Sequence, residues 1–226
     1  MKQTVMMDDD QQIRDALVVA MLGHAGRHGW GESALAMAEE EVIKTLPARA
    51  QAMVLSAFSG RSEQVAEHVF DWLNREMIAR VTRARDFAKQ SVREKISRLI
   101  EVRFAILAAH DAGARAWMRY LLPPPRSARA LVCAGRAADA IWRAAGDRST
   151  DSNYYTKRGL LLPILAASGV YWLSNPDSDH LGRFIRRAVN AAAKPPPLPP
   201  FSLIRDTMER AFLYAGGMKN TSAKTR

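Results

Sequence analysis

The sequence contains a single cysteine, Cys133, and this scarcity excludes a disulfide framework and a cysteine-rich zinc site. Cys133 lies in an apolar, alanine-rich context, which predicts a small buried side chain rather than a reactive thiol. No apolar run approaches the roughly 18 residues of a membrane span. The first residues carry an acidic run where a signal peptide needs an apolar core, so the chain is expected to stay in the cytoplasm.

Alternating runs of β-branched residues, which are typical of half-buried strands, are also missing. Alanine, leucine, arginine and glutamate dominate, and apolar residues recur at helical spacing along most of the chain. A composition of 48% hydrophobic and 25% charged residues over 226 positions is that of an ordinary globular protein. The sequence therefore predicts an all-α protein whose core needs no metal or disulfide.

Glycine and proline divide the chain into helices. Helices are expected at about 11–24, 34–44, 47–58, 64–109 (with a division near Arg85), 128–145, 153–173 (with a kink or restart at Pro163), 180–193 and 201–218. The predicted organisation is a flexible acidic N-terminus (1–10), a head (11–62), a helical ligand-binding bundle (63–193), a Pro-rich linker (194–200), an amphipathic helix (201–218) and a basic tail (219–226).

Three short helices followed by longer ones resemble the TetR family of repressors, as do the segments "GHAGRHGW" and "LSAFSGRSEQVAEHV". That family combines a DNA-binding head with a helical body around an apolar ligand cavity. Here the candidate recognition helix offers one cation, Arg49, and the preceding helix carries Glu39, Glu40 and Glu41, which repel phosphate. We therefore expect a degenerate helix-turn-helix-like head that binds no nucleic acid. A TetR-like transcriptional regulator that binds DNA is the alternative.

The net charge of +10 favours an anionic partner such as a membrane surface or an acidic protein. Part of this charge lies on the segment 75–103, which has nine Lys or Arg residues against four Asp or Glu residues. Such a segment is either a solvated helix face with internal ion pairs or a surface attracted to an anionic partner.

Motifs of catalysis are missing as well. The histidines form neither a His-Glu-x-x-His pair nor a Glu-x-x-His motif, and no Gly-rich phosphate loop or nucleophile elbow occurs. The candidate acids Asp147, Asp151, Asp177 and Asp179 fall at helix starts or turns, where carboxylates cap helices. The sequence thus predicts a protein that is not an enzyme, with no catalytic residue, metal or cofactor.

The last predicted helix, 201–218, gathers most of its apolar residues on one half of its surface. A Pro-rich linker separates it from the bundle, and cations follow it at Lys219, Lys224 and Arg226. Such a helix either packs on the bundle or lies in an anionic membrane interface. In the second case the membrane-binding residues are Phe201, Ile204, Met208 and Phe212.

The segment "DAIWRAAGDRSTDSNYYTKRGLL", 139–161, resembles the signature of a ubiquinone-biosynthesis accessory family, the ninth protein of the coenzyme Q pathway. The matching positions are Trp142, Ala145, Gly146, Asp147, Ser149, Thr150, Asp151, Asn153, Tyr155, Thr156 and Arg158. The segment "SNPDSDHLGRFIRRAVNAA" continues the resemblance, and Tyr154 replaces the family's Trp.

This resemblance implies a TetR-like fold that no longer binds DNA and whose cavity holds a phospholipid or an isoprenoid quinone intermediate. It implies a protein peripheral to the inner face of the cell membrane that presents this lipid to the di-iron demethoxyubiquinone hydroxylase. The docking patch for the hydroxylase would comprise Asp139, Ile141, Asp151, Tyr154 and Tyr155. The lipid would contact the residues Arg158, at its headgroup, and Leu161, Leu162 and Leu165. Plain core packing is the alternative role of these leucines, and the sequence leaves open whether the chain forms a homodimer.

Overall fold

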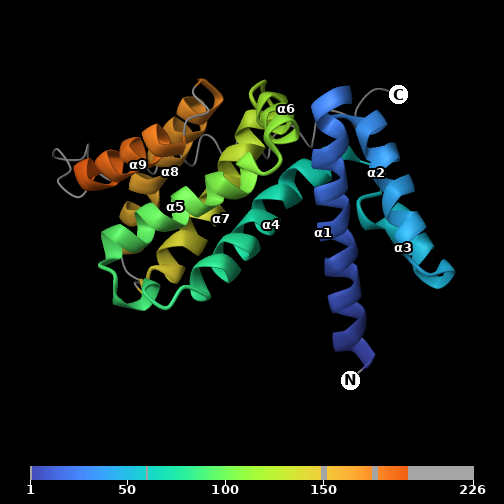
Figure 1. Cartoon of the computed structure of the whole chain (residues 1–226), viewed down its shortest axis with the longest axis horizontal. Helices are drawn as coiled ribbons and strands as arrows, with labels where there is room; N and C mark the ends of the chain where they lie inside the picture. Colours follow the sequence, from blue (N-terminus) through green and yellow to red (C-terminus); the bar gives the residue numbers. More distant parts are fainter. Residues whose placement is uncertain (1, 60, 149–151, 175–177, 193–226) are drawn as a thin grey trace, which may run out of the picture.

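The structure is a computed structural model that describes residues 2–59, 61–148, 152–174 and 178–192, with side chains except at 2–9, 49, 152–155 and 178. All regular secondary structure in these ranges is helical, which confirms the predicted all-α class. A head and a larger helical body follow the TetR-like plan, and Figure 1 shows the head at one end of the molecule.

The head consists of α1 (Lys2–His28), α2 (Glu32–Thr45) and α3 (Ala48–Ala57), and Figure 1 shows α2 and α3 on one side of α1. Helical spacing places Ile13, Leu17 and Met21 on one buried face of α1. Residues 2–10, where the sequence predicts a flexible acidic segment, belong to α1. An ion pair of Arg14 Nε with Asp10 Oδ2 at 2.8 Å, one turn apart, supports the helix in this acidic stretch.

The body consists of one short and six longer helical elements, among the described residues. They are α4 (Ser62–Thr82), the 3₁₀ helix η1 (Phe87–Lys89), α5 (Val92–Ala108), α6 (Asp111–Leu121), α7 (Arg126–Ala144), α8 (Ser152–Ser174) and α9 (Ser178–Ala192). In Figure 1, α4 leads away from α1, and α5, α7, α8 and α9 form the part of the body farthest from the head.

The long helical pattern 64–109 is divided near the predicted position. Helix α4 ends at Thr82, and α5 begins after Ser91, whose side chain and that of Glu94 form a reciprocal capping box. Helix α8, by contrast, runs through Pro163 without a restart, and this residue lies on the exposed face. The pyrrolidine ring therefore meets solvent rather than a neighbouring helix.

Helix α6 is the element for which the sequence predicts no helix, because it is short and contains Gly113. Its packing explains that glycine. A Cβ atom at Gly113 would lie 1.8 Å from the carbonyl oxygen of Leu22, so the backbones of α1 and α6 touch directly here. Since α1 packs against α6 as well as α2, the head is joined to the body along its longest helix.

Candidate ligand-binding cavity

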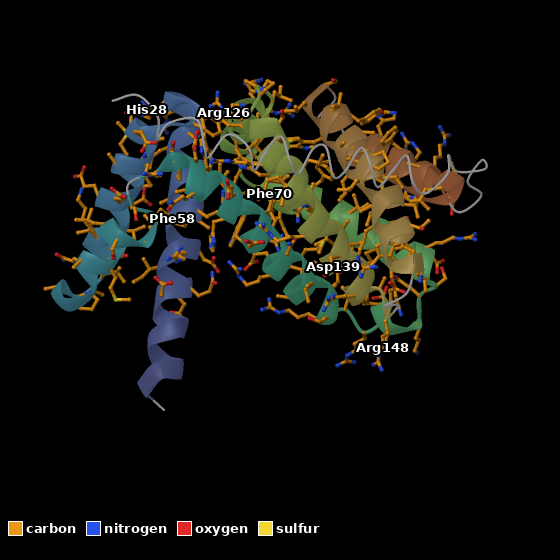
Figure 2. All side chains as sticks on the ribbon, turned by 180° about the vertical axis from the view of Figure 1, so that it is seen from behind. His28, Phe58, Phe70, Arg126, Asp139 and Arg148 are labelled. Carbon is orange, nitrogen blue, oxygen red and sulfur yellow. The ribbon has the colours of Figure 1, made fainter. Side chains whose placement is uncertain are left out.

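A cavity of about 300 Å³ lies within the body, enclosed by side chains from α4 to α8. Its lining is apolar apart from Arg103 and Ser127. The lining residues are Phe70, Arg103, Phe104, Leu107, Trp117, Met118, Leu121, Leu122, Ser127, Ala130, Leu131, Ala134, Ala137, Leu162, Leu165, Ala166, Gly169, Val170 and Leu173. Figure 2 labels two residues near it, Phe70 on α4 and Arg126 at the start of α7.

The inner wall of the cavity is built from fixed aromatic side chains. Phe70 and Trp117 meet edge to face with ring centroids 5.0 Å apart. The indole nitrogen of Trp117 donates to the carbonyl oxygen of Ala66 at 3.0 Å, which holds the ring against α4. Phe104 completes this wall and also packs near Trp172, at 6.2 Å between centroids. The inner wall is therefore preformed.

The outer end of the cavity is apolar and open to solvent. Leu122, Leu131 and Val170 line it and are 61%, 52% and 61% exposed, respectively. They come from the end of α6, from α7 and from α8. Large aliphatic side chains that converge on one opening are typical of a site that admits an apolar ligand.

Arg103 is the charged residue of the lining, and it is only 5% exposed. Its Nη1 donates to Asn74 Oδ1 at 2.7 Å, and its guanidinium carbon lies 5.7 Å from the centroid of the Phe70 ring. Burial lowers the pKa of Arg103 to about 10, against an opposing effect of the Asp71 carboxylate. The side chain therefore keeps its charge at neutral pH.

The sequence was not used to predict a site role for Arg103, although the pattern of α5 indicates that this residue is buried. Ile96, Leu99, Ile100 and Leu107 form the buried stripe of this helix, and Arg103 occupies the position between them. A cation within an apolar stripe indicates a buried charge, whereas the high charge of the segment 75–103 favours a solvated face. The burial of Arg103 follows from the apolar stripe of α5 and not from the charge of the segment.

The four predicted lipid contacts divide into two groups. Leu162 and Leu165 line the cavity, as the lipid hypothesis requires. Leu161 is buried but lies in the core outside the lining, in agreement with the alternative of plain packing. Arg158 is also absent from the lining of this cavity, so its predicted contact with a headgroup stays a prediction.

Arg158 instead ties α8 to α7. Its Nη2 lies 2.6 Å from Asp139 Oδ1, and its Nη1 lies 3.5 Å from Asp147 Oδ2. Lys157 Nζ pairs with Asp147 Oδ1 at 2.6 Å, and Arg143 Nε pairs with Asp139 Oδ2 at 2.8 Å. The carboxylates of Asp139 and Asp147 hold the Arg158 guanidinium at the joint between α7 and α8.

The signature segment forms the turn after α7. The N–H of Gly146 donates to the carbonyl of Arg143 at 3.0 Å, and that of Asp147 donates to the carbonyl of Trp142 at 2.9 Å. This pair of bonds is a Schellman motif, and its glycine has φ +100°, which few other residues tolerate. Trp142 Nε1 donates to the carbonyl of Lys157 at 2.9 Å. These signature residues thus stabilise the joint between α7 and α8.

The predicted docking patch is only partly described by the structure. Ile141 is fully buried in the core, so its assignment to a docking surface is wrong. The carboxylate of Asp139 is occupied by two arginines, and Figure 2 shows it farther along α7 than Arg126. Asp151 and the side chains of Tyr154 and Tyr155 lie outside the described residues.

The predicted membrane-binding residues Phe201, Ile204, Met208 and Phe212 likewise lie outside the described residues, as do the linker and the basic tail. Among the described helices, none is both long and apolar enough to cross a bilayer. In the same ranges, no group of three or more His, Cys, Asp or Glu residues has an arrangement that would hold a metal ion. Cys133 is buried as predicted, and burial raises the pKa of its thiol.

The head shows little that would bind DNA. Glu40 and Glu41 are exposed on α2, and Glu40 pairs with Lys44 at 2.7 Å. On α3, the described side chains include no cation, and the exposed ones are those of Ala48, Ala52, Leu55 and Ser56. The described side chains of α3 therefore offer no cation for phosphate contacts, and the side chain of Arg49 lies outside them.

Comparison with known proteins finds similarity to one family. The sequence model of the family described as COQ9 matches residues 127–194. The human "Ubiquinone biosynthesis protein COQ9, mitochondrial" is 23% identical over 193 residues, which are 82% of this chain and 59% of that protein. The Drosophila melanogaster protein of the same description is 23% identical over 171 residues, 74% of this chain and 51% of that protein.

A third relative, from Dictyostelium discoideum, is a "Probable ubiquinone biosynthesis protein coq9, mitochondrial" with 27% identity over 90 residues, 40% of this chain and 29% of that protein. This chain thus spans about three fifths of the length of its human relative. The segment matched by the family model includes α7, α8 and α9 with the Schellman turn. The resemblance predicted from the signature is therefore confirmed: the chain is similar to the COQ9 family over residues 127–194 and to ubiquinone biosynthesis proteins over most of its length.

Proposed function

We propose that this protein acts in ubiquinone biosynthesis as a non-catalytic lipid-binding protein. The observation that carries the proposal is the apolar cavity between α4 and α8 with its exposed aliphatic opening. Burying a leucine or valine side chain stabilises a complex by about 1.5–3 kcal/mol. A lipid chain that covers Leu122, Leu131 and Val170 therefore gains free energy that a polar metabolite does not.

The size of the cavity favours partial enclosure of the ligand. Its volume of about 300 Å³ is at the lower end of the range for small-molecule sites. Such a space encloses a head and the first part of a chain, and the remainder leaves through the opening. An isoprenoid quinone intermediate or a phospholipid has this form, and the similarity to ubiquinone biosynthesis proteins favours a lipid of the quinone pathway.

The family resemblance extends the proposal to a partner. We propose that the protein presents its lipid to the di-iron demethoxyubiquinone hydroxylase at the membrane. Since Ile141 is buried and Asp139 is paired with arginines, docking would depend on Asp151, Tyr154 and Tyr155 in the signature segment. Tyrosine is common among the residues that dominate binding at protein interfaces.

The membrane part of the proposal depends on charge and on the C-terminal sequence. A net charge of +10 attracts the protein to anionic lipid, and the amphipathic pattern of 201–218 fits the membrane interface. We propose a peripheral location on the inner face of the membrane, from which lipid enters the cavity. Packing of the segment 201–218 on the bundle is the competing possibility.

The cavity is tested by filling it from α7. Ala134 lines the cavity, whereas Ala128 is exposed on the same helix and lies outside the lining. Full-length wild type, Ala134→Phe and Ala128→Phe are purified, extracted with organic solvent and compared by lipid mass spectrometry. We expect wild type and Ala128→Phe to carry lipid at similar stoichiometry and Ala134→Phe to carry several-fold less.

The identity of the lipid then tests the finer part of the proposal. Isoprenoid quinone or a precursor would support a role in ubiquinone biosynthesis, whereas phospholipid alone would support lipid binding without the quinone assignment. Wild-type protein without lipid, together with lipid uptake that is equal in all three proteins, would contradict the proposal. Salt-dependent DNA binding would then favour the alternative function, a transcriptional regulator that binds DNA.

A further inference from the structure

The cavity contains a buried cation without a carboxylate partner. Arg103 forms no ion pair within 4.0 Å among the described residues, although it is nearly fully enclosed. The nearby Asp71 carboxylate is engaged by Arg136, at 3.3 Å. A buried charge that lacks a partner is strongly destabilising, so most proteins pair it or avoid it.

Two of the three guanidinium nitrogens of Arg103 are available. Nη1 donates to Asn74 Oδ1, whereas Nε and Nη2 have no hydrogen-bond acceptor among the described residues. Since Arg103 lines the cavity, its guanidinium is the charged group that a ligand there would meet.

The contacts of Arg103 with other residues explain its position, but they provide no acceptor for Nε and Nη2. Asn74 is itself buried on α4, and the Phe70 ring lies 5.7 Å from the guanidinium carbon. These contacts orient the planar group. Neither contact uses the edge of the guanidinium formed by Nε and Nη2. The parallel N–H bonds of this edge match the two oxygens of a carboxylate.

We propose that Arg103, held by Asn74, is the head site of the cavity and binds the carboxylate of a single-chain amphiphile. The amphiphile enters head first and leaves its chain in the opening formed by Leu122, Leu131 and Val170. This assignment rests on the proposed function, because it requires that the cavity binds lipid. A neutral quinone or alcohol oxygen receives hydrogen bonds from the same edge without neutralising the charge.

The test compares three amphiphiles that share one chain. Binding of decanoate, decanol and decyltrimethylammonium to full-length, delipidated protein is measured by titration calorimetry at neutral pH. We expect decanoate to bind at least about tenfold more tightly than decanol, because a bidentate carboxylate adds charge-assisted hydrogen bonds. The ammonium compound is expected to bind most weakly, since it places a second cation beside Arg103.

Variants assign this preference to Arg103. Arg103→Met should bind decanol as wild type does but bind decanoate no more tightly than decanol. If the single variant folds poorly, Arg103→Met combined with Asn74→Leu removes both hydrogen-bond partners and avoids an unpaired buried amide. Arg119→Met deletes the same charge from an exposed position of α6 and should keep the preference for decanoate.

Three results separate this assignment from the proposed function. Equal binding of decanoate and decanol by wild type would overturn the head site and leave the lipid cavity in place. A preference that survives in Arg103→Met would place the head elsewhere. Failure of wild type to bind any of the three compounds would overturn both the head site and the lipid-binding proposal.

Discussion

Replacement of Arg158 by methionine separates a structural role of this residue from contact with a lipid headgroup. The Arg158 side chain is 10% exposed and lies between the carboxylates of Asp139 and Asp147. Removing one partner of a buried ion pair costs about 3–5 kcal/mol. Because Arg143 and Lys157 remain beside these carboxylates, we expect the lower part of that range, about 3 kcal/mol of unfolding free energy.

The measurement is urea denaturation followed by circular dichroism, in which the midpoint should fall while the slope stays unchanged. Arg143→Met is the matched control, because Arg143 pairs with the same Asp139 but its side chain is 68% exposed. Its loss should change the unfolding free energy by no more than about 0.5 kcal/mol. An Arg158→Met protein that is as stable as the control but loses its lipid would refute the structural role.

Three further predictions concern packing, pH and thiol reactivity. Gly113→Ala should lower the unfolding free energy by about 3 kcal/mol, because the new Cβ would collide with the backbone of α1. Gly135→Ala is the control: it has open space around it and should raise the unfolding free energy by about 0.5–1 kcal/mol in the same denaturation assay. Burial, aided by Arg80, lowers the pKa of His110, so the folded state favours the neutral ring. The contribution of His110 to stability should therefore be fully present above the unfolded-state pKa of about 6.5 and be lost as the pH drops through the folded-state pKa. His110→Phe should remove this pH dependence, and a wild type whose stability does not change over this range would contradict the prediction. Cys133 should react with a thiol reagent only at the rate of unfolding, and fast labelling of native protein would show that its thiol is accessible.

Local sequence patterns predict the helices of this protein well, because a helix needs only an apolar stripe and suitable ends. The proline break at 121–126 separates α6 from α7, and the break between α4 and α5 lies near the predicted Arg85. The sequence does not predict α6, because glycine weakens an isolated helix. In the folded protein, Gly113 instead allows close packing of α6 against α1.

The family signature shows the limit of a resemblance for assigning residue roles. The signature predicts the similarity to the COQ9 family that the comparison finds, yet the structure shows that Trp142, Gly146 and Arg158 hold the α7–α8 joint together. A scaffold residue and a ligand-binding residue look alike in a motif, since both are specific in type and spacing. Only the positions of Asp139 and Asp147 beside Arg158 decide between the two.

The sequence by itself determined the all-α class, most helix boundaries, the positive net charge and the relation to a ubiquinone-biosynthesis family. It also placed Leu161, Leu162 and Leu165 on an apolar helix, of which Leu162 and Leu165 line the cavity and Leu161 does not. The tertiary structure alone decided which cation faces the cavity. Arg158 pairs with the carboxylates of Asp139 and Asp147, 19 and 11 positions away along the chain. Arg103 instead donates to the amide of Asn74, 29 positions away, and lines the apolar cavity. The burial and partners of a charge depend on which helices pack together, and that information is not contained in the pattern of any one helix.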